Sequence, residues 1–342
     1  LTDYRTQNRG GRGVSGGMTR DDDFVERMFV ASTHAYLLCF TSLGLVYWMR
    51  VFRVPKLSRT SQGRALANVL SLRAEEKISG ILPVASLAET DGQSVVMVTR
   101  RGVVKKTPLA DYSRPRNGGI IAINLDEGDS LIGSAIVREG EHVMLVTRNG
   151  MAIRFDASDT RDTGRNTRGV KGINLVGDDE VVGMVVVDPA GALLTVCANG
   201  FGKRTPFGVS TGDDEEDEGA ETETPEPATS EDGEETPEPS TLRYRRQRRG
   251  GKGVRDIKVE GRNGPVIGIA AVKGDEDLIL ISANGMVNRS PIGQIRLCGR
   301  NTKGVRLINL REGDRVASLA VVAHEEPLPT EETEAPPAPP TA

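Results

Sequence analysis

Arginine, lysine and glycine recur together in short loops of this chain, and this combination suits the binding of phosphate groups. The segment QRRGGKG (residues 247–253) places three bases around paired glycines, and QNRGGRG (residues 7–13) is a close variant. Glycine lets the backbone approach a partner closely, so that backbone N–H and guanidinium groups can converge on one phosphate. The residues expected to take part are Gln247, Arg248, Arg249, Gly250, Gly251, Lys252, Gly253, Gln7, Arg9, Gly10, Gly11 and Arg12.

Two further sets of bases recur at fixed positions. One set follows a glycine turn, with a base four residues after the glycine, and comprises Lys106, Arg154, Arg204 and Arg289, with Lys105 and Lys203 directly before two of them. The other set lies in GRNT-type loops and comprises Arg165, Arg168, Lys171, Arg300, Lys303 and Arg306. We expect these recurring bases to form one curved positive track that binds phosphates without reading the base sequence. A duplex laid along such a track must bend, at a cost of about 1–6 kcal/mol for a site of about 20–30 base pairs.

The formal net charge of −4 conceals an uneven distribution of charge. Residues 213–238 contain 14 Asp or Glu and no Lys or Arg, and residues 325–334 contain five more acids. Without these 19 acids, 29 acids stand against 44 bases, a balance of about +15. Such an excess of positive charge is typical of a nucleic-acid-binding domain.

Motifs for catalysis or metal binding are missing from the sequence. No Walker loop, GxSxG elbow, CxxC pair or HExxH motif occurs. Cys39, Cys197 and Cys298 are far apart, and we expect buried thiols in a reducing cytoplasm. Acidic pairs such as Asp126 with Asp129 could bind a divalent ion, but turn chemistry explains them better. We therefore expect no catalytic residue, metal or cofactor, and no enzyme activity in this chain alone.

The basic loops alternate with segments that have the pattern of β-hairpins. Each hairpin segment has two β-rich runs around a glycine, and three of the five turns are Asn-Gly, which favours a tight turn. The hairpins are expected at residues 37–50, 95–107, 143–155, 193–205 and 278–290. Six loop segments, each continuing through a strand, an acidic turn and a second strand, are expected at residues 8–30, 63–84, 117–137, 164–187, 248–272 and 299–322.

A repeat of about 50 residues with four strands is typical of a propeller. The sequence predicts an all-β, six-bladed β-pinwheel or propeller-like disc of four-stranded blades. We expect one hairpin to be missing at the N-terminus, because residues 1–5 resemble residues 108–113, which follow a hairpin.

The predicted domains follow from this repeat. Residues 1–210 are expected to form blades one to four and residues 241–323 the remaining blades. The Glu-, Thr- and Pro-rich residues 211–240 are expected to be a disordered acidic insertion, and residues 324–342 a disordered acidic, Pro-rich tail. No signal peptide is evident at the start, and polar residues interrupt the uncharged residues 28–49, so neither secretion nor membrane insertion is expected.

The QRRGGKG box, the GRNT loops, the hairpins and the acidic tail together resemble the C-terminal domain of the A subunit of bacterial DNA gyrase, over essentially the whole chain. The resemblance implies a disc that wraps duplex DNA around its rim, so that ATP-driven strand passage introduces negative supercoils. It also implies a heterotetramer with the B subunit of gyrase and with the breakage-reunion domain that precedes this type of domain. The cleaving tyrosine and the ATPase would lie outside this chain.

Two departures from the family pattern and two alternatives accompany this interpretation. In the family the box belongs to the first blade, where this chain has residues 7–13 with Asn8 and Arg12 in place of Arg and Lys, whereas the complete box lies in the fifth unit. The acidic insertion is also unusual. The alternatives are the related topoisomerase IV domain, which would bind DNA with less wrapping, and a protein-interaction propeller whose rim binds an acidic partner.

Overall fold

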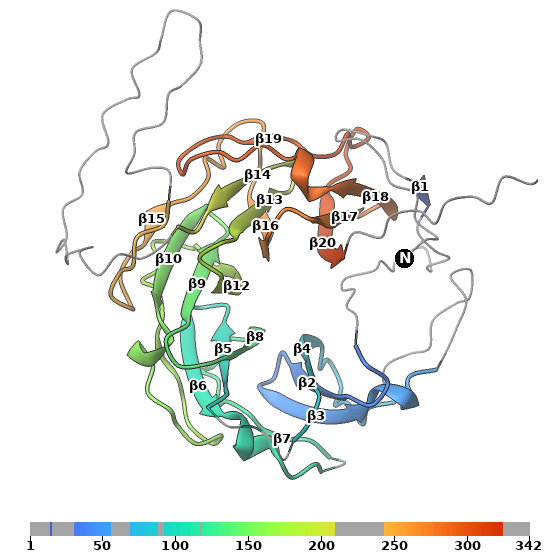
Figure 1. Ribbon diagram of the computed structural model, residues 1–342, viewed down its shortest axis with the longest axis vertical. Helices are drawn as coiled ribbons and strands as arrows, with labels where there is room; N and C mark the ends of the chain where they lie inside the picture. The colour runs from blue at the N-terminus through green and yellow to red at the C-terminus, as the bar shows by residue number, and fades with distance from the viewer. Residues whose placement is uncertain are drawn as a thin grey trace, which may run out of the picture.

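The chain folds into antiparallel sheets built from very similar strands. The computed structural model describes residues 14–15, 31–55, 69–87, 90, 92–116, 118–208 and 243–323. These residues form five four-stranded sheets, here called blades I to V in chain order of their hairpins. Figure 1 shows the blades arranged in a ring, with one strand of each blade facing the centre.

Each blade has the same order of strands from the centre outward. The inner strands are β4 (Ile78–Val84), β8 (Leu131–Val137), β12 (Val181–Val187), β16 (Val266–Val272) and β20 (Val316–Ala323). The hairpins are β2 (Tyr36–Thr41) with β3 (Leu45–Arg50), β5 (Ser94–Thr99) with β6 (Val103–Pro108), β9 (His142–Thr147) with β10 (Met151–Asp156), β13 (Ala192–Cys197) with β14 (Phe201–Pro206), and β17 (Glu276–Ser282) with β18 (Met286–Pro291).

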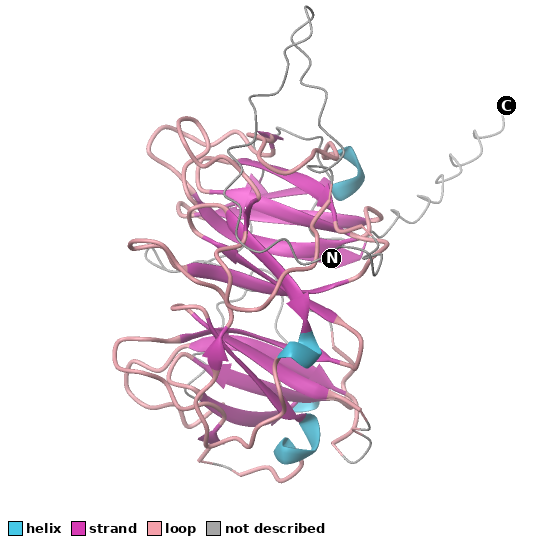
Figure 2. Cartoon of the chain, turned by 90° about the vertical axis from the view of Figure 1, so that its left-hand side faces the viewer, coloured by secondary structure: helices cyan, strands magenta, loops and turns pink. Residues whose placement is uncertain are grey.

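A strand of two residues completes the outer edge of each blade. From blade I to blade V these outer strands are β7 (Ile120–Ile121), β11 (Val170–Lys171), β15 (Val254–Arg255), β19 (Val305–Arg306) and β1 (Val14–Ser15). Short 3-10 helices follow four of the hairpins, at η1 (Val51–Arg53), η3 (Leu109–Tyr112), η4 (Ala157–Asp159) and η6 (Ile292–Gln294). Figure 2 shows the strands of the blades stacked in a side view, with loops at their ends.

The four strands of one blade come from two consecutive repeat units. The outer strand of a blade follows the hairpin of the next blade along the chain, so that β7 completes blade I although it follows β6 of blade II. In the same way β1 pairs with β18, with Val14 opposite Val287, and joins the start of the chain to the last blade. This exchange ties each blade to its neighbour.

The expectation of an all-β propeller is confirmed, but the number of blades differs from the prediction. Six blades were expected, and the described residues form five. The five hairpins yield five complete blades. Four of the six loop segments are divided between two blades, and in the described residues the other two contribute only β1 and β4. Residues 16–30, where the inner strand of the first loop segment was expected, lie outside the described part of the chain.

The hydrophobic core lies between blades rather than within one central cluster. Leu38 and Phe40 of blade I pack with Val95 and Met97 of blade II, and equivalent clusters join the blades that follow. Both faces of an internal blade are therefore covered by its neighbours. Only strand edges, turns and loops of such a blade reach the solvent.

A bulge near the start of each inner strand accompanies this close packing. The pairing register shifts after the first residues of β4, β8, β12, β16 and β20. In β12 the shift brings Gly183 close to the next blade, where an added Cβ atom would lie 2.8 Å from Cγ1 of Ile269. Glycine at this position therefore sets how closely two blades approach.

The uncharged segment at residues 28–49 does not form a membrane helix where it is described. Its residues 36–49 belong to the hairpin of β2 and β3. Within the described ranges no helix is long and apolar enough to cross a membrane.

Candidate nucleic-acid interface

Four loop segments carry the outer strands and form a belt along the outer edge of the ring. We call them straps I to IV, comprising residues 113–116 with 118–125, 163–175, 247–259 and 298–310. At their start, straps II to IV are each hydrogen-bonded to the second hairpin strand of the preceding unit. The donors are the backbone N–H groups of Thr163, Gln247 and Cys298, and the acceptors are the carbonyls of Lys106, Arg154 and Arg204, respectively, at 2.8–2.9 Å.

Consecutive straps are also hydrogen-bonded to each other. The N–H of Asn124 donates to the Thr167 carbonyl at 3.0 Å, and the N–H of Asn174 donates to the Gly251 carbonyl at 2.8 Å. The N–H of Lys258 in strap III donates to the carbonyl of Thr302 in strap IV at 3.0 Å. The four straps thus form a continuous backbone scaffold across blades I to IV.

The bases of a strap stand at three positions, spaced three residues apart. The third position is the second residue of the outer strand, so the pairing of the outer strands aligns the straps residue by residue. Straps II, III and IV carry Arg or Lys at all three positions, namely Arg165, Arg168 and Lys171, then Arg249, Lys252 and Arg255, then Arg300, Lys303 and Arg306.

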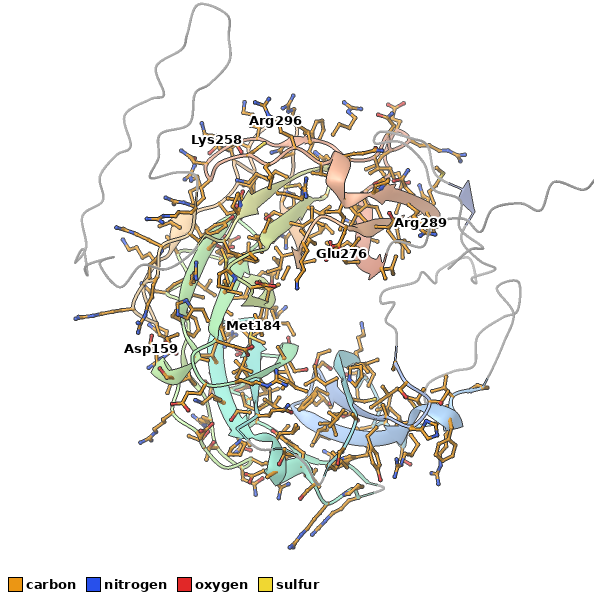
Figure 3. The ribbon with its side chains drawn as sticks, in the orientation of Figure 1. Asp159, Met184, Lys258, Glu276, Arg289 and Arg296 are labelled. Carbon is orange, nitrogen blue, oxygen red and sulfur yellow. The ribbon has the colours of Figure 1, made fainter. Side chains whose placement is uncertain are left out.

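Exposure separates the three positions. All six bases at the second and third positions are exposed, whereas Arg165, Arg249 and Arg300 at the first position are partly buried. Figure 3 shows that Lys258 of strap III and Arg296, just before strap IV, also lie at the outer edge of the ring. The outer edge of blades II to IV is therefore lined with cations in a repeating register.

The partly buried bases help to hold the straps in place. In the box, Arg249 donates from Nε to the Asp159 carbonyl at 3.1 Å and from Nη1 to the carbonyl of Lys171 in strap II. Arg300 donates from Nε to the Arg243 carbonyl at 2.8 Å, and burial lowers its pKa. These guanidinium groups support the exposed bases on either side of them.

The glycines of the box have distinct roles. Gly250 (φ +88°) and Gly253 (φ +80°) lie in the left-handed region that favours glycine. An added Cβ at Gly253 would lie 2.5 Å from the Ala152 carbonyl, so the strap can approach β10 only without a side chain there. The Gly250 N–H donates to the Gly172 carbonyl of strap II at 2.8 Å.

Several exposed bases make surface contacts that solvent weakens. Arg168 pairs with Asp126 at 3.0 Å, and both side chains are more than half exposed. Arg306 donates to Oδ1 of Asn309 at 3.0 Å and lies 5.0 Å from the ring centroid of Phe201. Exposed ion pairs contribute about 0–1 kcal/mol, so phosphate groups can compete for these side chains.

The bases of the hairpins, in contrast, lie in the interior, which corrects the expectation that they join the surface track. Lys105 is 1% exposed, and its Nζ donates to the carbonyls of Ala122 at 2.6 Å and Arg165 at 2.5 Å. Lys203 is 0% exposed and pairs with Asp256 at 3.2 Å. Burial lowers the pKa of both amines, to about 8 for Lys105. Each lysine joins two neighbouring straps from beneath.

Three of the four bases that stand four residues after a turn glycine connect one blade to the next. Buried Arg154 donates from Nη1 to the carbonyls of Phe207, Gly208 and Tyr244, and buried Arg204 donates to the carbonyls of Gly293 and Ile295. Nζ of the partly buried Lys106 lies 3.8 Å from Oδ1 of Asp162. Buried Arg289 of the last blade pairs with Asp277 of its own hairpin at 2.7 Å.

These inward positions have one physical cause. Alternate side chains of a strand point to opposite faces of its sheet, and both faces of an internal blade are covered. A base on a hairpin strand therefore points into an interface between blades whichever face it occupies. The repeat spacing correctly located the hairpin bases but not the direction of their side chains.

Sequence reasoning missed Arg255, which occupies the third position of strap III and is exposed. The repeat in the sequence could have identified Arg255, because Val254–Arg255 aligns with Val170–Lys171 and Val305–Arg306. Exposed Arg248, also in the box, precedes Arg249 of strap III. The predicted residues Gln7, Arg9, Gly10, Gly11 and Arg12 lie outside the described residues.

The acidic turns act as backbone caps. Asp129 accepts hydrogen bonds from the N–H groups of Arg101 and Ser130, at 3.0 and 2.8 Å. Asp179 accepts equivalent bonds from the N–H groups of Asn149 and Glu180. In the described ranges no group of His, Cys, Asp or Glu could hold a metal ion. Cys39 and Cys197 are buried free thiols whose pKa burial raises to about 12.

The chain matches a family model described as the DNA gyrase C-terminal domain, beta-propeller. The match covers residues 1–32, 35–85, 93–138, 141–188, 243–273 and 276–323. The A subunit of DNA gyrase from Salmonella typhimurium is 40% identical over 335 residues, covering 98% of this chain and 34% of that protein. Its counterpart from Deinococcus deserti is 39% identical over 334 residues, covering 96% of this chain and 37% of that protein. The chain thus spans about a third of the length of these relatives.

Solved structures share the architecture. A DNA gyrase A C-terminal domain superposes with a TM-score of 0.74 at 23% identity, covering 94% of both chains. A topoisomerase IV C-terminal domain superposes with a TM-score of 0.67 at 22% identity, covering 85% of this chain and 80% of that one. At these identities the likeness concerns the fold. Because the family model covers most of the chain, and the two relatives are about 40% identical over nearly all of it, the chain belongs to the DNA gyrase C-terminal domain family.

Proposed function

We propose that this domain binds duplex DNA along the straps and bends it around the outer edge of the ring. The observation that carries this proposal is the alignment of exposed cations at the second and third positions of straps II, III and IV, six in all. Their common register on successive blades suits a polyanion that follows the edge. No base-reading element is needed, because phosphate contacts position a duplex without reading its sequence.

We further propose that the bend serves DNA supercoiling by a complete gyrase. In that assembly the domain would present wrapped DNA to the breakage-reunion domain, and the B subunit would supply ATP hydrolysis, in a cytoplasmic heterotetramer. The relatives that support this role are gyrase A subunits, of which this chain spans the C-terminal type of domain. The cleaving tyrosine would then lie in another domain.

Binding to duplexes of increasing length, each measured at several salt concentrations, tests the proposal. A wrapping domain gains affinity until the duplex encircles the contact edge, and log K falls linearly with log salt. The variant K252Q/R255Q, which removes two exposed strap bases, should weaken binding and reduce the slope by up to about 1.8, at about 0.9 for each lost phosphate contact.

The variant R138Q/K273Q is the matched control, because Arg138 and Lys273 are exposed bases that follow inner strands β8 and β16 and lie outside the straps. It should leave the slope nearly unchanged. Equal losses in K252Q/R255Q and R138Q/K273Q would show that binding depends on overall charge and would refute a strap interface.

The sign of the DNA writhe trapped by ligation separates wrapping from simple binding. We expect a positive writhe for a gyrase-type domain. A topoisomerase IV-type domain would bind with little trapped writhe, and a protein-interaction propeller would show no dependence on duplex length. The complete QRRGGKG box in strap III favours the gyrase type.

A further inference from the structure

Strap I lacks the cations that the other three straps share. Its outer strand β7 pairs with β3, with Ile121 opposite Leu45, just as Lys171 lies opposite Val103 and Arg306 opposite Phe201. This common pairing gives strap I the same register as straps II to IV. The three strap positions, which hold bases in the other straps, are Pro115, Gly118 and Ile121 in strap I.

The surface of strap I differs accordingly. Ile121 is 41% exposed and presents an apolar side chain at the position where the other described straps present Lys171, Arg255 and Arg306. Gly118 is exposed and offers no side chain at all. Arg114 and Arg116 of strap I are exposed, but they flank the first position, and the second and third positions remain without charge.

We propose that the phosphate-binding track ends at strap I, so that bound DNA follows straps II to IV and leaves the edge of the ring at blade I. This inference rests on the proposed function and adds a direction and an end point to the wrap. Blade I has the same backbone scaffold as its neighbours, since Asn124 of strap I is hydrogen-bonded to Thr167 of strap II. The missing cations, rather than a missing strap, define the end.

The structure permits a gain-of-function test at this site. Gly118 has no positive φ, and no atom lies within 4 Å of an added Cβ, so a lysine fits there. Ile121 is partly exposed, and a lysine can extend from it into solvent. The variant G118K/I121K thus restores bases at the second and third positions without disturbing the left-handed Gly119 (φ +67°), whose added Cβ would meet the Tyr47 ring.

Footprinting on a long linear duplex and salt-dependent binding should be measured for wild type and G118K/I121K. We expect the protected region to lengthen, and the slope of log K against log salt to steepen by up to about 1.8, for two added phosphate contacts. The reverse variant K303Q/R306Q, which removes the same two positions from strap IV, should shorten the protected region and reduce the slope by a similar amount.

The control variant is A190K/A271K, which adds the same charge at exposed positions in the turn after inner strand β12 and on inner strand β16. An equal footprint and slope for G118K/I121K and A190K/A271K would overturn the inference while the wild type still binds DNA. If the wild-type domain shows no salt-dependent binding to duplex DNA, the proposed function itself fails. The two failures are therefore distinguishable.

Discussion

At the scale of single residues, the surroundings decide what a lysine or arginine does in this protein. Lys303 and Arg255 are exposed on straps, whereas Lys105 and Lys203 are buried beneath them. The buried amines donate to strap carbonyls and fix the backbone that presents the exposed bases. Lysines and arginines of neighbouring positions thus divide into an exposed set and a buried, supporting set.

The pH dependence of stability should report the buried Lys105. Burial lowers its pKa from 10.5 to about 8 in the folded protein, so between these values the unfolded chain binds more protons than the folded one. Lys105 therefore makes the free energy of unfolding rise as the pH increases from about 8 to about 10.5. Urea unfolding across this range should show a steeper rise for wild type than for K105M.

The variant K303M is the control, because it removes an exposed lysine. K105M should also lower the free energy of unfolding by about 1–3 kcal/mol at neutral pH, since two carbonyls lose their donor. If the free energy of unfolding changed with pH in the same way for wild type and K105M, the rise could not be assigned to Lys105.

At the scale of elements, the strap is a short edge strand whose position depends on glycine. Gly150 of the hairpin turn accepts hydrogen bonds from the N–H groups of Asp256 and Ile257, at 2.8 and 3.4 Å, and the same contacts recur on Gly102 and Gly200. In strap III, Gly253 lets the backbone pass close to Ala152. The exposed bases on either side depend on this close approach.

The substitution G253A should destabilise the domain and displace strap III. It combines an unfavourable positive φ with an overlap against the Ala152 carbonyl, and we expect a loss of about 2–4 kcal/mol in the free energy of unfolding. DNA affinity should fall even at temperatures where the domain remains folded. Denaturant unfolding and duplex binding measure the two effects.

The substitution G261A separates the cost of backbone strain from the cost of steric overlap. Gly261 has a φ of +71°, yet nothing lies within 4 Å of an added Cβ, so only the backbone strain remains. Its cost should be about 1 kcal/mol. If G253A and G261A cost the same, the contact with Ala152 would have no part in positioning the strap.

At the scale of the whole molecule, the ring depends on contacts between blades. Cores lie between adjacent blades, and the outer strand of each blade comes from another unit of the chain, with β1 completing blade V. Arg154 adds a contact of this kind, because one guanidinium nitrogen binds the carbonyls of Phe207, Gly208 and Tyr244. Gly208 and Tyr244, which lie close to the two limits of the described chain around residues 209–242, are thereby held close together.

The acidic segment should compete with DNA for the basic straps. It carries 14 Asp or Glu, and the chain returns from it at Arg243, shortly before the box. Deletion of residues 211–239 should therefore raise affinity for duplex DNA at moderate salt. The deletion is compatible with the fold, because an added Cβ at Gly208 would lie only 3.0 Å from Cβ of Arg243.

A variant of full length with Asn and Gln in place of the 14 acids separates charge from chain length. Competition by charge predicts that this variant gains as much affinity as the deletion. Binding isotherms that are unchanged in both variants would contradict it.

Much of the fold could be predicted from the repeat. The turn glycines Gly102, Gly150 and Gly200 all have positive φ, as the hairpin patterns predicted, and alternating β-rich runs indicated an all-β propeller. The described residues form five blades because they contain five hairpins, and residues 16–30, where the inner strand of the sixth, incomplete blade was expected, lie outside the described ranges. The strap loops were located, and Arg168, Lys171, Lys252, Lys303 and Arg306 are indeed exposed.

The repeat, the turn chemistry and the positions of the bases can be deduced from the sequence, because they depend on local backbone preferences and spacing. Which bases face the solvent depends on how the blades pack against one another. Lys105, Arg154 and Lys203 became interior contacts because both faces of a blade are covered, and Arg255 became a surface base because it lies on an uncovered edge. Burial is a property of the packed blades, and a strand pattern that repeats identically cannot specify it in advance.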